Sequence, residues 1–254
     1  MTAPVLCAPL EGVTGSVFRR AHSRWFGGIG AYYMPFLSPR QTHSLTAREL
    51  REVRPENNQG LRAVPQLLTA RWQDFLWAAE KLSELGYREV NLNLGCPSGT
   101  VTAKGKGAGL LGRREGLEEL LDEIFARCPL EISIKTRLGL REGAEFAALL
   151  ELFGRYPVKR LILHPRVGRQ MYRGGVDLAA YAAALEGCAL PVCYNGDLTR
   201  REEVAALLER FPRTESVMLG RGLAGDPALA RRCAGGPPAG REEPGGYHND
   251  LYPG

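Results

Sequence analysis

A single thiol stands where a predicted strand changes into a glycine-rich loop. Residues 89–94 alternate polar and apolar side chains, as a strand does, and Gly95-Cys96-Pro97 follows directly. Pro97 has no backbone N–H and biases Cys96 towards an extended backbone, so the strand should end here. Asn93 precedes the thiol, and Lys104 and Lys106 follow it on what we expect to be a flexible lip. This grouping predicts a reaction site for an anionic or heteroaromatic substrate. The alternative is a structural cysteine, because free cysteines are often buried.

Polar side chains also stand at the predicted ends of other strands. They supply amides, an ammonium group, an imidazole and a guanidinium, and they are Gln66, Asn93, Lys135, His164, Asn195 with Asp197, and Arg221. Each alone has a structural explanation, but the set favours function. The four histidines show no metal-ligand spacing, and no Ser/His/Asp pattern is present. We therefore predict a ring of donors around a planar, acceptor-rich ligand, with no metal.

The elements that position these residues alternate between two types. Eight strand-like runs are separated by mostly helical segments, and the runs are residues 5–10, 29–35, 63–68, 89–94, 131–137, 160–166, 191–197 and 216–222. This pattern predicts an α/β protein with a (β/α)₈ TIM barrel, in which every strand points its carboxyl end at one face. A doubly wound open sheet is the alternative. Its usual Gly-x-Gly-x-x-Gly fingerprint is missing after the first run.

Two glycine-containing strand ends predict where a phosphate binds. Asn195-Gly196 and Gly220-Arg221 end the seventh and eighth runs, which is the usual place for phosphate-binding loops in barrels. Gln66 and Lys135 would then face a ring system. A phosphorylated flavin satisfies both sets of groups.

Composition narrows the class of protein. The chain has 254 residues, of which 44% are hydrophobic, and it contains no apolar run of about 18 residues, so we expect no membrane span. The amino terminus lacks a basic segment followed by an apolar one, and the six cysteines are dispersed without a Cys-x-x-Cys pair. We therefore expect a cytoplasmic protein with reduced cysteines. The net charge of +5 permits nucleic-acid binding without being diagnostic of it.

The motifs, taken in order, closely resemble the tRNA-dihydrouridine synthases, which are flavin-dependent reductases of uridine in RNA. Each motif is weak alone, but together they are specific and extend from residue 5 to about residue 232. They are Ala8-Pro9-Leu10 with Gly12-Val13-Thr14, Val64-Pro65-Gln66-Leu67, Asn91-Leu92-Asn93-Leu94-Gly95-Cys96-Pro97, Gly107-Ala108-Gly109-Leu110-Leu111, Ile134-Lys135-Thr136-Arg137, His164-Pro165-Arg166, Tyr172-Arg173-Gly174, Asn195-Gly196-Asp197, and Gly220-Arg221-Gly222 with Asp226-Pro227.

The resemblance implies FMN as the bound cofactor and NADPH as the reductant. The residues implied to hold FMN are Ala8, Pro9, Leu10, Gln66, Lys135, His164, Asn195, Gly196, Asp197, Gly220 and Arg221. It also implies that Asn93 orients the uracil and that Cys96 is the catalytic acid. Hydride from flavin N5 would reach uracil C6, and the thiol proton would reach C5. An unperturbed thiol has a pKa of about 8.5, so it can donate near neutral pH.

RNA is the implied partner, as tRNA or another structured RNA, with Lys104 and Arg166 among the substrate contacts. Ten basic residues fall in or beside the loops that follow strands: Arg40, Lys104, Lys106, Arg113, Arg114, Arg137, Arg141, Arg166, Arg169 and Arg173. A barrel would place them on the catalytic face, where phosphates can be tracked. The alternative is that loops are simply where charges gather. The oligomeric state is left open.

The end of the chain departs from the family pattern. Family members continue into a C-terminal helical domain that grips RNA, whereas half of residues 235–254 are glycine or proline. We therefore expect a catalytic domain over residues 1–234 and a flexible tail over residues 235–254, the vestige of that helical domain. One alternative is an FMN-dependent reductase of a free enone or pyrimidine. Another is a non-catalytic RNA-binding remnant, against which the presence of Asn93, Cys96 and Lys135 argues.

Overall fold

The computed structural model describes residues 3–252 of the chain. The strands are β1 Val5–Cys7, β2 Ala31–Tyr33, β3 Ala63–Val64, β4 Gln66–Leu67, β5 Glu89–Leu94, β6 Glu131–Arg137, β7 Leu161–His164, β8 Val192–Tyr194 and β9 Ser216–Leu219. The helices are α1 Ser16–Trp25, α2 Ala47–Val53, α3 Trp72–Glu84, α4 Gly99–Thr102, α5 Ala108–Leu111, α6 Arg114–Arg127, α7 Glu145–Phe153, α8 Leu178–Gly187, α9 Arg201–Arg210, α10 Arg221–Gly225, α11 Leu229–Cys233 and α12 Glu243–Leu251, with 3-10 turns η1 Pro55–Asn57 and η2 Gly168–Gln170.

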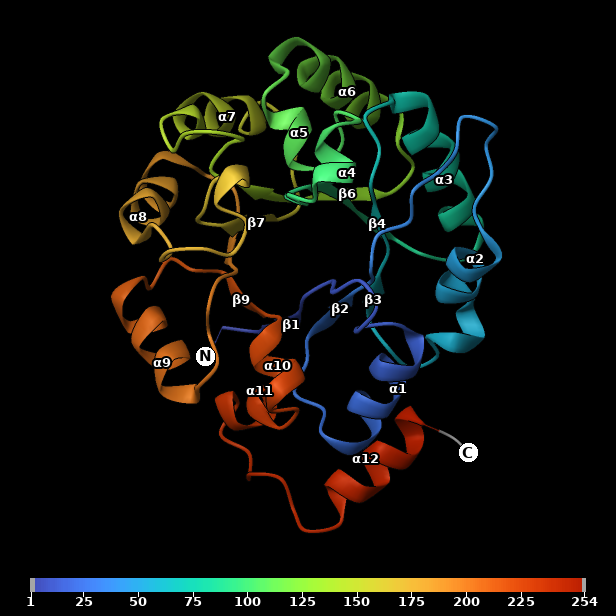
Figure 1. The fold of residues 1–254 in the computed structure, drawn as a ribbon, viewed down its shortest axis with the longest axis vertical. Helices are drawn as coiled ribbons and strands as arrows, with labels where there is room; N and C mark the ends of the chain where they lie inside the picture. Colours follow the sequence, from blue (N-terminus) through green and yellow to red (C-terminus); the bar gives the residue numbers. More distant parts are fainter. Residues whose placement is uncertain (1–2, 253–254) are drawn as a thin grey trace.

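The strands form a barrel in which every pair of neighbouring strands is parallel. Their order is β3-β2-β1-β9-β8-β7-β6-β5-β4, so the two ends of the sheet are β3 and β4. These are halves of one run broken at Pro65, which has no N–H to donate. The N–H of Met34 donates to Val64 O (2.9 Å) on one side, and the N–H of Asn91 donates to Pro65 O (2.8 Å) on the other. The run therefore closes the sheet, and the predicted (β/α)₈ fold is confirmed (Figure 1).

Alternation along β5 explains how polar and apolar side chains share one buried strand. All six of its residues are buried. Val90, Leu92 and Leu94 belong to the large core between barrel and helices. Residues two apart share a face of a strand, so Asn91 and Asn93 point the other way, into the barrel. No helix within residues 3–252 has the length and apolar character needed to cross a membrane.

The amino-terminal end of the barrel is closed by an internal chain of charges. Tyr33 Oη donates to Glu89 Oε1 (3.0 Å) and accepts from Arg160 Nη1 (3.0 Å). Arg160 also donates to both carboxylate oxygens of Glu215, from Nε at 2.8 Å and from Nη2 at 2.7 Å. Each buried charge therefore has an opposite charge or a hydroxyl beside it, as burial requires.

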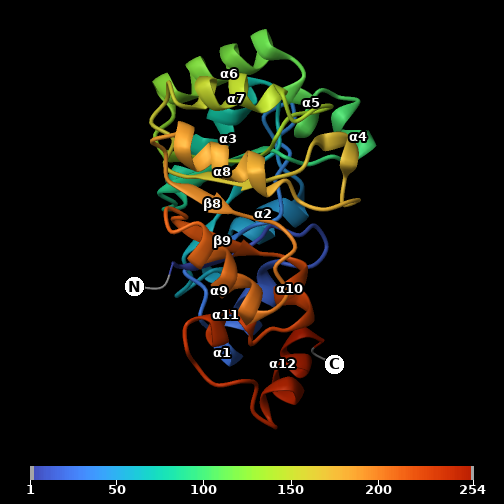
Figure 2. The same cartoon turned by 90° about the vertical axis from the view of Figure 1, so that its left-hand side faces the viewer.

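Residues 243–251 form helix α12, although their glycine and proline content predicted a flexible tail. The helix lies beside α1 in both views (Figures 1 and 2). The Tyr247 ring meets Phe26 edge-on at a centroid distance of 5.1 Å, and Trp25 Nε1 donates to Asp250 Oδ2 (2.7 Å). These tertiary contacts outweigh the low helix propensity of glycine, which is about 1 kcal/mol per residue.

We expect Gly246→Ala to loosen α12. Its added Cβ would lie 2.3 Å from ring atoms of Trp25, and the hydrogen bond to Asp250 holds that ring in place. Overpacking of this kind costs about 1 to 3 kcal/mol, and each kcal/mol lowers the thermal midpoint by about 2 to 4 °C in a protein of this size. Gly245→Ala is the matched control, because its Cβ would meet nothing within 4 Å. Thermal unfolding should separate the two variants, and equal midpoints would contradict the docking of α12.

Candidate active site

The Asn93 side chain is fixed by the backbone of the turn that follows it. The N–H groups of Gly95 and Cys96 donate to Asn93 Oδ1 at 3.1 and 2.9 Å. Backbone N–H groups can face only an oxygen, so Asn93 Nδ2 must point the other way, where it donates to Gln66 Oε1 (2.7 Å). One Nδ2 hydrogen remains for a ligand. The turn therefore orients both Asn93 and the thiol-bearing residue.

A row of amides behind Asn93 continues this orientation into the barrel. Gln66 Nε2 donates to Asn91 Oδ1 (2.7 Å), and Asn91 Nδ2 donates to Ser133 Oγ (2.9 Å). Gln66 is fully buried. Its Oε1 accepts from Asn93 and so holds that side chain in place, and one Nε2 hydrogen is left for a cofactor. Sequence reasoning missed Asn91 and Ser133. The signal was available, because Asn91 shares a strand face with Asn93 and pairs in register with Ser133.

The glycine-rich segment after Cys96 is compact, although it was expected to be a flexible lip. It folds into α4 and α5, and the N–H of Ala108 donates to Cys96 O (3.0 Å). Gly107 has a φ of 56°, and a Cβ there would lie 2.7 Å from Cys96 O. Only glycine permits this approach without strain. The thiol is half-buried and is held between the Asn93 turn and α5.

Lys104 and Lys106 differ in their surroundings. Lys104 is exposed, as a residue that contacts RNA would be. Lys106 is half-buried and donates through Nζ to Ser38 Oγ (3.1 Å), and burial lowers its pKa. Lys106 therefore ties α5 to the loop that follows β2.

Lys135 places a cation directly opposite Asn93. The two residues are register partners across β5 and β6. Burial lowers the pKa of Lys135 to about 8, with Arg137 adding to the effect. Among residues 3–252, no side chain forms an ion pair with it. An unpaired ammonium of this kind suits an acceptor-rich or anionic ligand.

Arg137 is buried and holds two loops together. Its side chain is 2% exposed, and its Nε donates to Gly95 O (2.9 Å). Its Nη1 donates to Val167 O (3.1 Å) and Met171 O (2.7 Å). The expected position among surface phosphate contacts is therefore wrong, because these carbonyls have taken its donors. Arg137 joins the turn that carries Cys96 to the loop that follows β7.

His164 is neutral, and its tautomer follows from its partner. Arg166 Nη1 lies 3.0 Å from His164 Nε2, and a guanidinium can only donate, so Nε2 accepts and Nδ1 carries the hydrogen. Burial, followed by the charges of Lys135 and three arginines, holds the pKa of His164 far below its usual range. The imidazole therefore offers one N–H donor to a ligand.

Arg166 is buried, although we expected it to contact the substrate. It is 2% exposed, and its Nη1 donates to Asp197 Oδ1 (3.0 Å) and lies against His164, while its Nη2 donates to Gly174 O. Arg221 Nη2 also donates to Asp197 Oδ1 (2.7 Å). The hydrogen bond from Arg166 is the main cause that lowers the pKa of Asp197. Arg166 therefore positions Asp197 and His164. Its buried Nε has no hydrogen-bond partner within residues 3–252.

The end of β1 is held by Thr14, which the sequence indicated only as part of a motif. Thr14 Oγ1 accepts from the N–H of Leu10 (2.8 Å) and donates to Ala8 O (3.1 Å). The N–H of Ala8 in turn donates to Leu219 O (2.8 Å). These bonds fix the Ala8-Pro9-Leu10 turn beside the end of β9.

The ends of β8 and β9 offer backbone donors. Asn195 Nδ2 donates to Met218 O (2.9 Å), which joins the two strand ends. Gly196 follows Asn195, and Gly220 precedes α10. The first N–H groups of a helix have no partner within the helix and therefore suit an anion. Together with the orphaned Nε of Arg166, these groups fit the phosphate of FMN, and Lys135 fits its ring.

Tyr172 is a further residue at this end of the barrel to which sequence reasoning gave no role. It is 56% exposed, and the guanidinium groups of Arg137 and Arg221 each lie 5.4 Å from its ring centroid. An aromatic ring at the mouth of the site can stack on a nucleobase.

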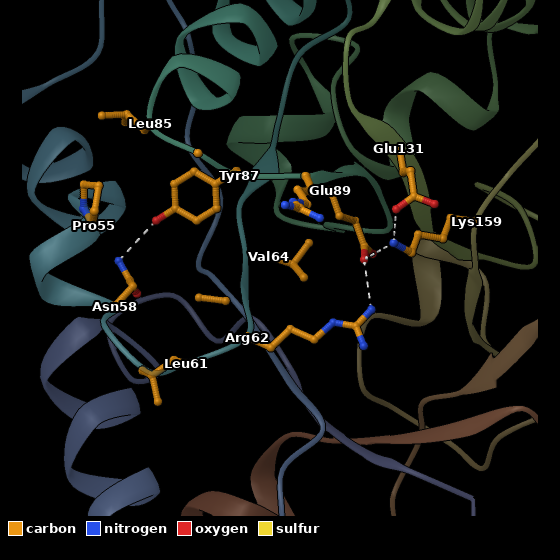
Figure 3. A pocket seen from close by; sticks show the side chains of 13 residues that line it. Pro55, Asn58, Leu61, Arg62, Val64, Leu85, Tyr87, Glu89, Glu131 and Lys159 are labelled. Carbon is orange, nitrogen blue, oxygen red and sulfur yellow. Dashed lines mark hydrogen bonds and ion pairs between the residues drawn. The ribbon is translucent and has the colours of Figure 1, made fainter.

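Cavity size does not locate this site. A cavity of about 510 Å³ lies at the amino-terminal end of the barrel instead (Figure 3). Two of its cations are paired, since Lys159 and Arg62 lie 3.2 and 3.7 Å from Glu89. In the part of the chain that the structure describes, no three His, Cys, Asp or Glu side chains gather as metal ligands would. The candidate active site is therefore the carboxyl end of the barrel, where the donors converge.

Comparison with known proteins bears on this arrangement. A family model described as dihydrouridine synthase matches residues 6–240. A probable tRNA-dihydrouridine synthase of Rhodobacter capsulatus is 31% identical over 228 residues, which are 88% of this chain and 68% of that protein. The probable tRNA-dihydrouridine synthase 1 of Synechocystis sp. is 33% identical over 230 residues, which are 89% of this chain and 62% of that protein.

Solved structures agree on the fold. A morphinone reductase in complex with tetrahydroNAD is similar with a TM-score of 0.66 and 12% identity, over 96% of this chain and 90% of that one. A 2-naphthoyl-CoA reductase complex is similar with a TM-score of 0.69 and 11% identity, over 92% of this chain and 50% of that one. At these identities the likeness concerns the fold alone.

We expect Arg137→Met to lower the free energy of unfolding by about 3 kcal/mol. Three carbonyl oxygens lose their donor in a buried place, and an unsatisfied buried group costs about 1 to 3 kcal/mol. Urea unfolding measures the loss. Arg169→Met, at an exposed position, is the control and should change stability by less than about 0.5 kcal/mol. If the two variants unfold at the same urea concentration, Arg137 does not brace the loops.

Proposed function

The chain belongs to the dihydrouridine synthase family, and from that premise we propose that it reduces uridine in RNA, foremost tRNA, to dihydrouridine with bound FMN and NADPH as reductant. The names of its relatives support tRNA as the substrate. The single observation that carries the chemistry is the turn that fixes Asn93 and Cys96 together, opposite Lys135.

The residues that would hold FMN fall into two groups. Lys135, Gln66 and the Ala8-Pro9-Leu10 turn face the ring, and the Nδ1–H of His164 adds a donor. The residues for the phosphate are Asn195, Gly196, Gly220 and Arg221, with Asp197 and Arg166 holding the arginine and imidazole in place. Bound and reduced FMN supplies a hydride for C6 of the uracil.

Cys96 and Asn93 would complete the reduction. The free Nδ2 hydrogen of Asn93 can bind a uracil carbonyl and so orient the ring. The Cys96 thiol gives its proton to C5, and the S–H electron pair remains on sulfur as a thiolate. Arg137 holds the Cys96 turn through Gly95 O (2.9 Å), and Lys135 lies opposite Asn93 in the register of the two strands. Tyr172 is placed to stack beside a base that has left its helix.

The surface charges around the site support an RNA substrate. Arg137 and Arg166 leave the set of basic residues predicted to track phosphates, because they are buried. The exposed cations that remain, none of them in an ion pair within residues 3–252, are Arg40, Lys104, Arg113, Arg141, Arg169 and Arg173. A polyanion can neutralise them together.

We expect the purified protein to be yellow, with absorbance near about 450 nm, and to form dihydrouridine in unmodified tRNA when NADPH is supplied. Cys96→Ala should keep the flavin and bind tRNA, while product formation measured by mass spectrometry falls by about 100-fold or more, the usual loss of a general acid. Cys233→Ala, a half-buried cysteine on α11, is the control. Normal turnover by Cys96→Ala would refute the proton donor. Turnover of free enones or pyrimidines in place of tRNA would refute the substrate.

We expect FMN affinity to fall as the pH rises through about 8. The pKa of Lys135 is about 8 without cofactor, so its charge is present below that pH and is lost above it. If the ammonium binds the flavin, the dissociation constant rises by up to about tenfold per pH unit until the higher pKa of the complex is reached. Lys135→Arg keeps its charge and should remove this dependence. Fluorescence titration of FMN measures both proteins, and a flat wild-type profile would contradict the assignment.

A further inference from the structure

We propose that a groove beside the Cys96 loop binds the phosphate backbone of the substrate RNA next to the target nucleotide, with Arg141 and Arg169 as the phosphate ligands. This inference rests on the proposed function, since it assumes an RNA substrate. The groove is open to solvent and has a volume of about 480 Å³, and its lining residues are Gly99, Thr102, Ala103, Leu140, Arg141 and Arg169.

The position of the groove links it to the reaction. One wall is α4, which begins at Gly99, three residues after Cys96. The other wall comes from the loop after β6 and from η2. In Figure 2, α4 and α5 project together on the right-hand side of the molecule. A strand of RNA that presents a flipped-out base to Cys96 must therefore pass this groove with its neighbouring phosphates.

The two arginines are carried by backbone that is already held in place. The Glu145 carboxylate accepts from the N–H groups of Leu140 and Arg141, both at 2.8 Å. The N–H of Arg169 donates to Leu140 O (3.0 Å), which joins η2 to the loop after β6. The spacing between the two arginine backbones is therefore set before RNA arrives. A site held in this way loses less entropy on binding.

Among the described residues, the guanidinium groups of the groove make no ion pair with a carboxylate, although the charge of Arg141 helps to lower the pKa of the nearby Glu145. Neither Arg141 nor Arg169 donates a side-chain hydrogen bond or joins an ion pair within residues 3–252, and both are exposed. The neighbouring Glu145 carboxylate is engaged by backbone donors. The cavity at the other end of the barrel differs, because its Lys159 and Arg62 already face Glu89 (Figure 3). The groove therefore needs its anion from outside.

A long polyanion suits the groove better than a single small anion. Exposed Lys104 follows α4 directly, and exposed Arg113 stands just before α6. Gly99 has nothing within 4 Å of a Cβ built on it, so the wall of the groove is open at this residue. These cations continue the charge of the groove along the same face, as successive phosphates of one strand require.

The test uses FMN-loaded protein and compares two double variants. Arg141→Ala with Arg169→Ala should raise the dissociation constant for unmodified tRNA by about tenfold near 0.1 M salt and reduce the slope of log affinity against log salt by about two. Reduction of the flavin by NADPH, followed by stopped flow, should keep its rate. Arg88→Ala with Arg210→Ala removes the same charge from exposed positions outside the carboxyl-end loops and is expected to keep both values. Flavin content and thermal midpoint check that each variant is folded.

The outcomes separate this inference from the proposed function. If the wild type forms dihydrouridine and the Arg141/Arg169 variant binds tRNA with unchanged affinity and salt slope, the groove is not a phosphate site. If flavin reduction by NADPH slows instead, the groove serves the reductant and the inference is wrong. If the wild type forms no dihydrouridine in any RNA, the proposed function fails and this inference fails with it.

Discussion

The two hydrogen bonds that Asn93 Oδ1 accepts from Gly95 and Cys96 set the geometry of the whole catalytic end. They turn the chain out of β5, and they determine which end of each buried amide faces which neighbour, from Asn93 through Gln66 to Asn91. A buried amide that faced the wrong way would leave a donor against a donor, which is costly in a medium of low polarity. The thiol and the substrate-orienting amide therefore share one rigid support.

The two ends of the barrel differ in how their charged side chains are paired. At the amino-terminal end, Tyr33 links Arg160 to Glu89, Arg160 also binds Glu215, and Lys159 and Arg62 in the cavity beside them pair with Glu89. At the carboxyl end, Asp197 joins Arg166 to Arg221. Lys135, Arg141 and Arg169 have no carboxylate within ion-pair distance among residues 3–252. Paired charges stabilise a fold, whereas unpaired cations at a converging set of donors favour anionic ligands. This asymmetry favours the carboxyl end as the place where an anionic ligand binds.

The glycine-rich segments of the chain pack closely in the structure, although their glycine content predicted flexibility. The segment after Cys96 and the segment after residue 235 both seemed too rich in glycine to be ordered. Gly107 instead lets α5 approach the Cys96 carbonyl, and Gly246 lets α12 lie against the Trp25 ring. A missing Cβ permits close packing as well as freedom. Which of the two applies depends on what lies opposite, and composition does not record that.

The sequence by itself determined the fold class, the strand ends and the residue types at the site, because strand alternation and the Gly-Cys-Pro break are local properties of the chain. It identified Asn93, Cys96 and Lys135 as neighbours at one end of a barrel. Only the tertiary structure decided which cations are free. Arg137 lies two residues after Lys135 on β6, and Arg166 lies just after β7, yet backbone carbonyls and Asp197 engage their donors, so both are buried and brace loops. Those partners come from other strands, and their arrival depends on packing between residues that are distant in the chain.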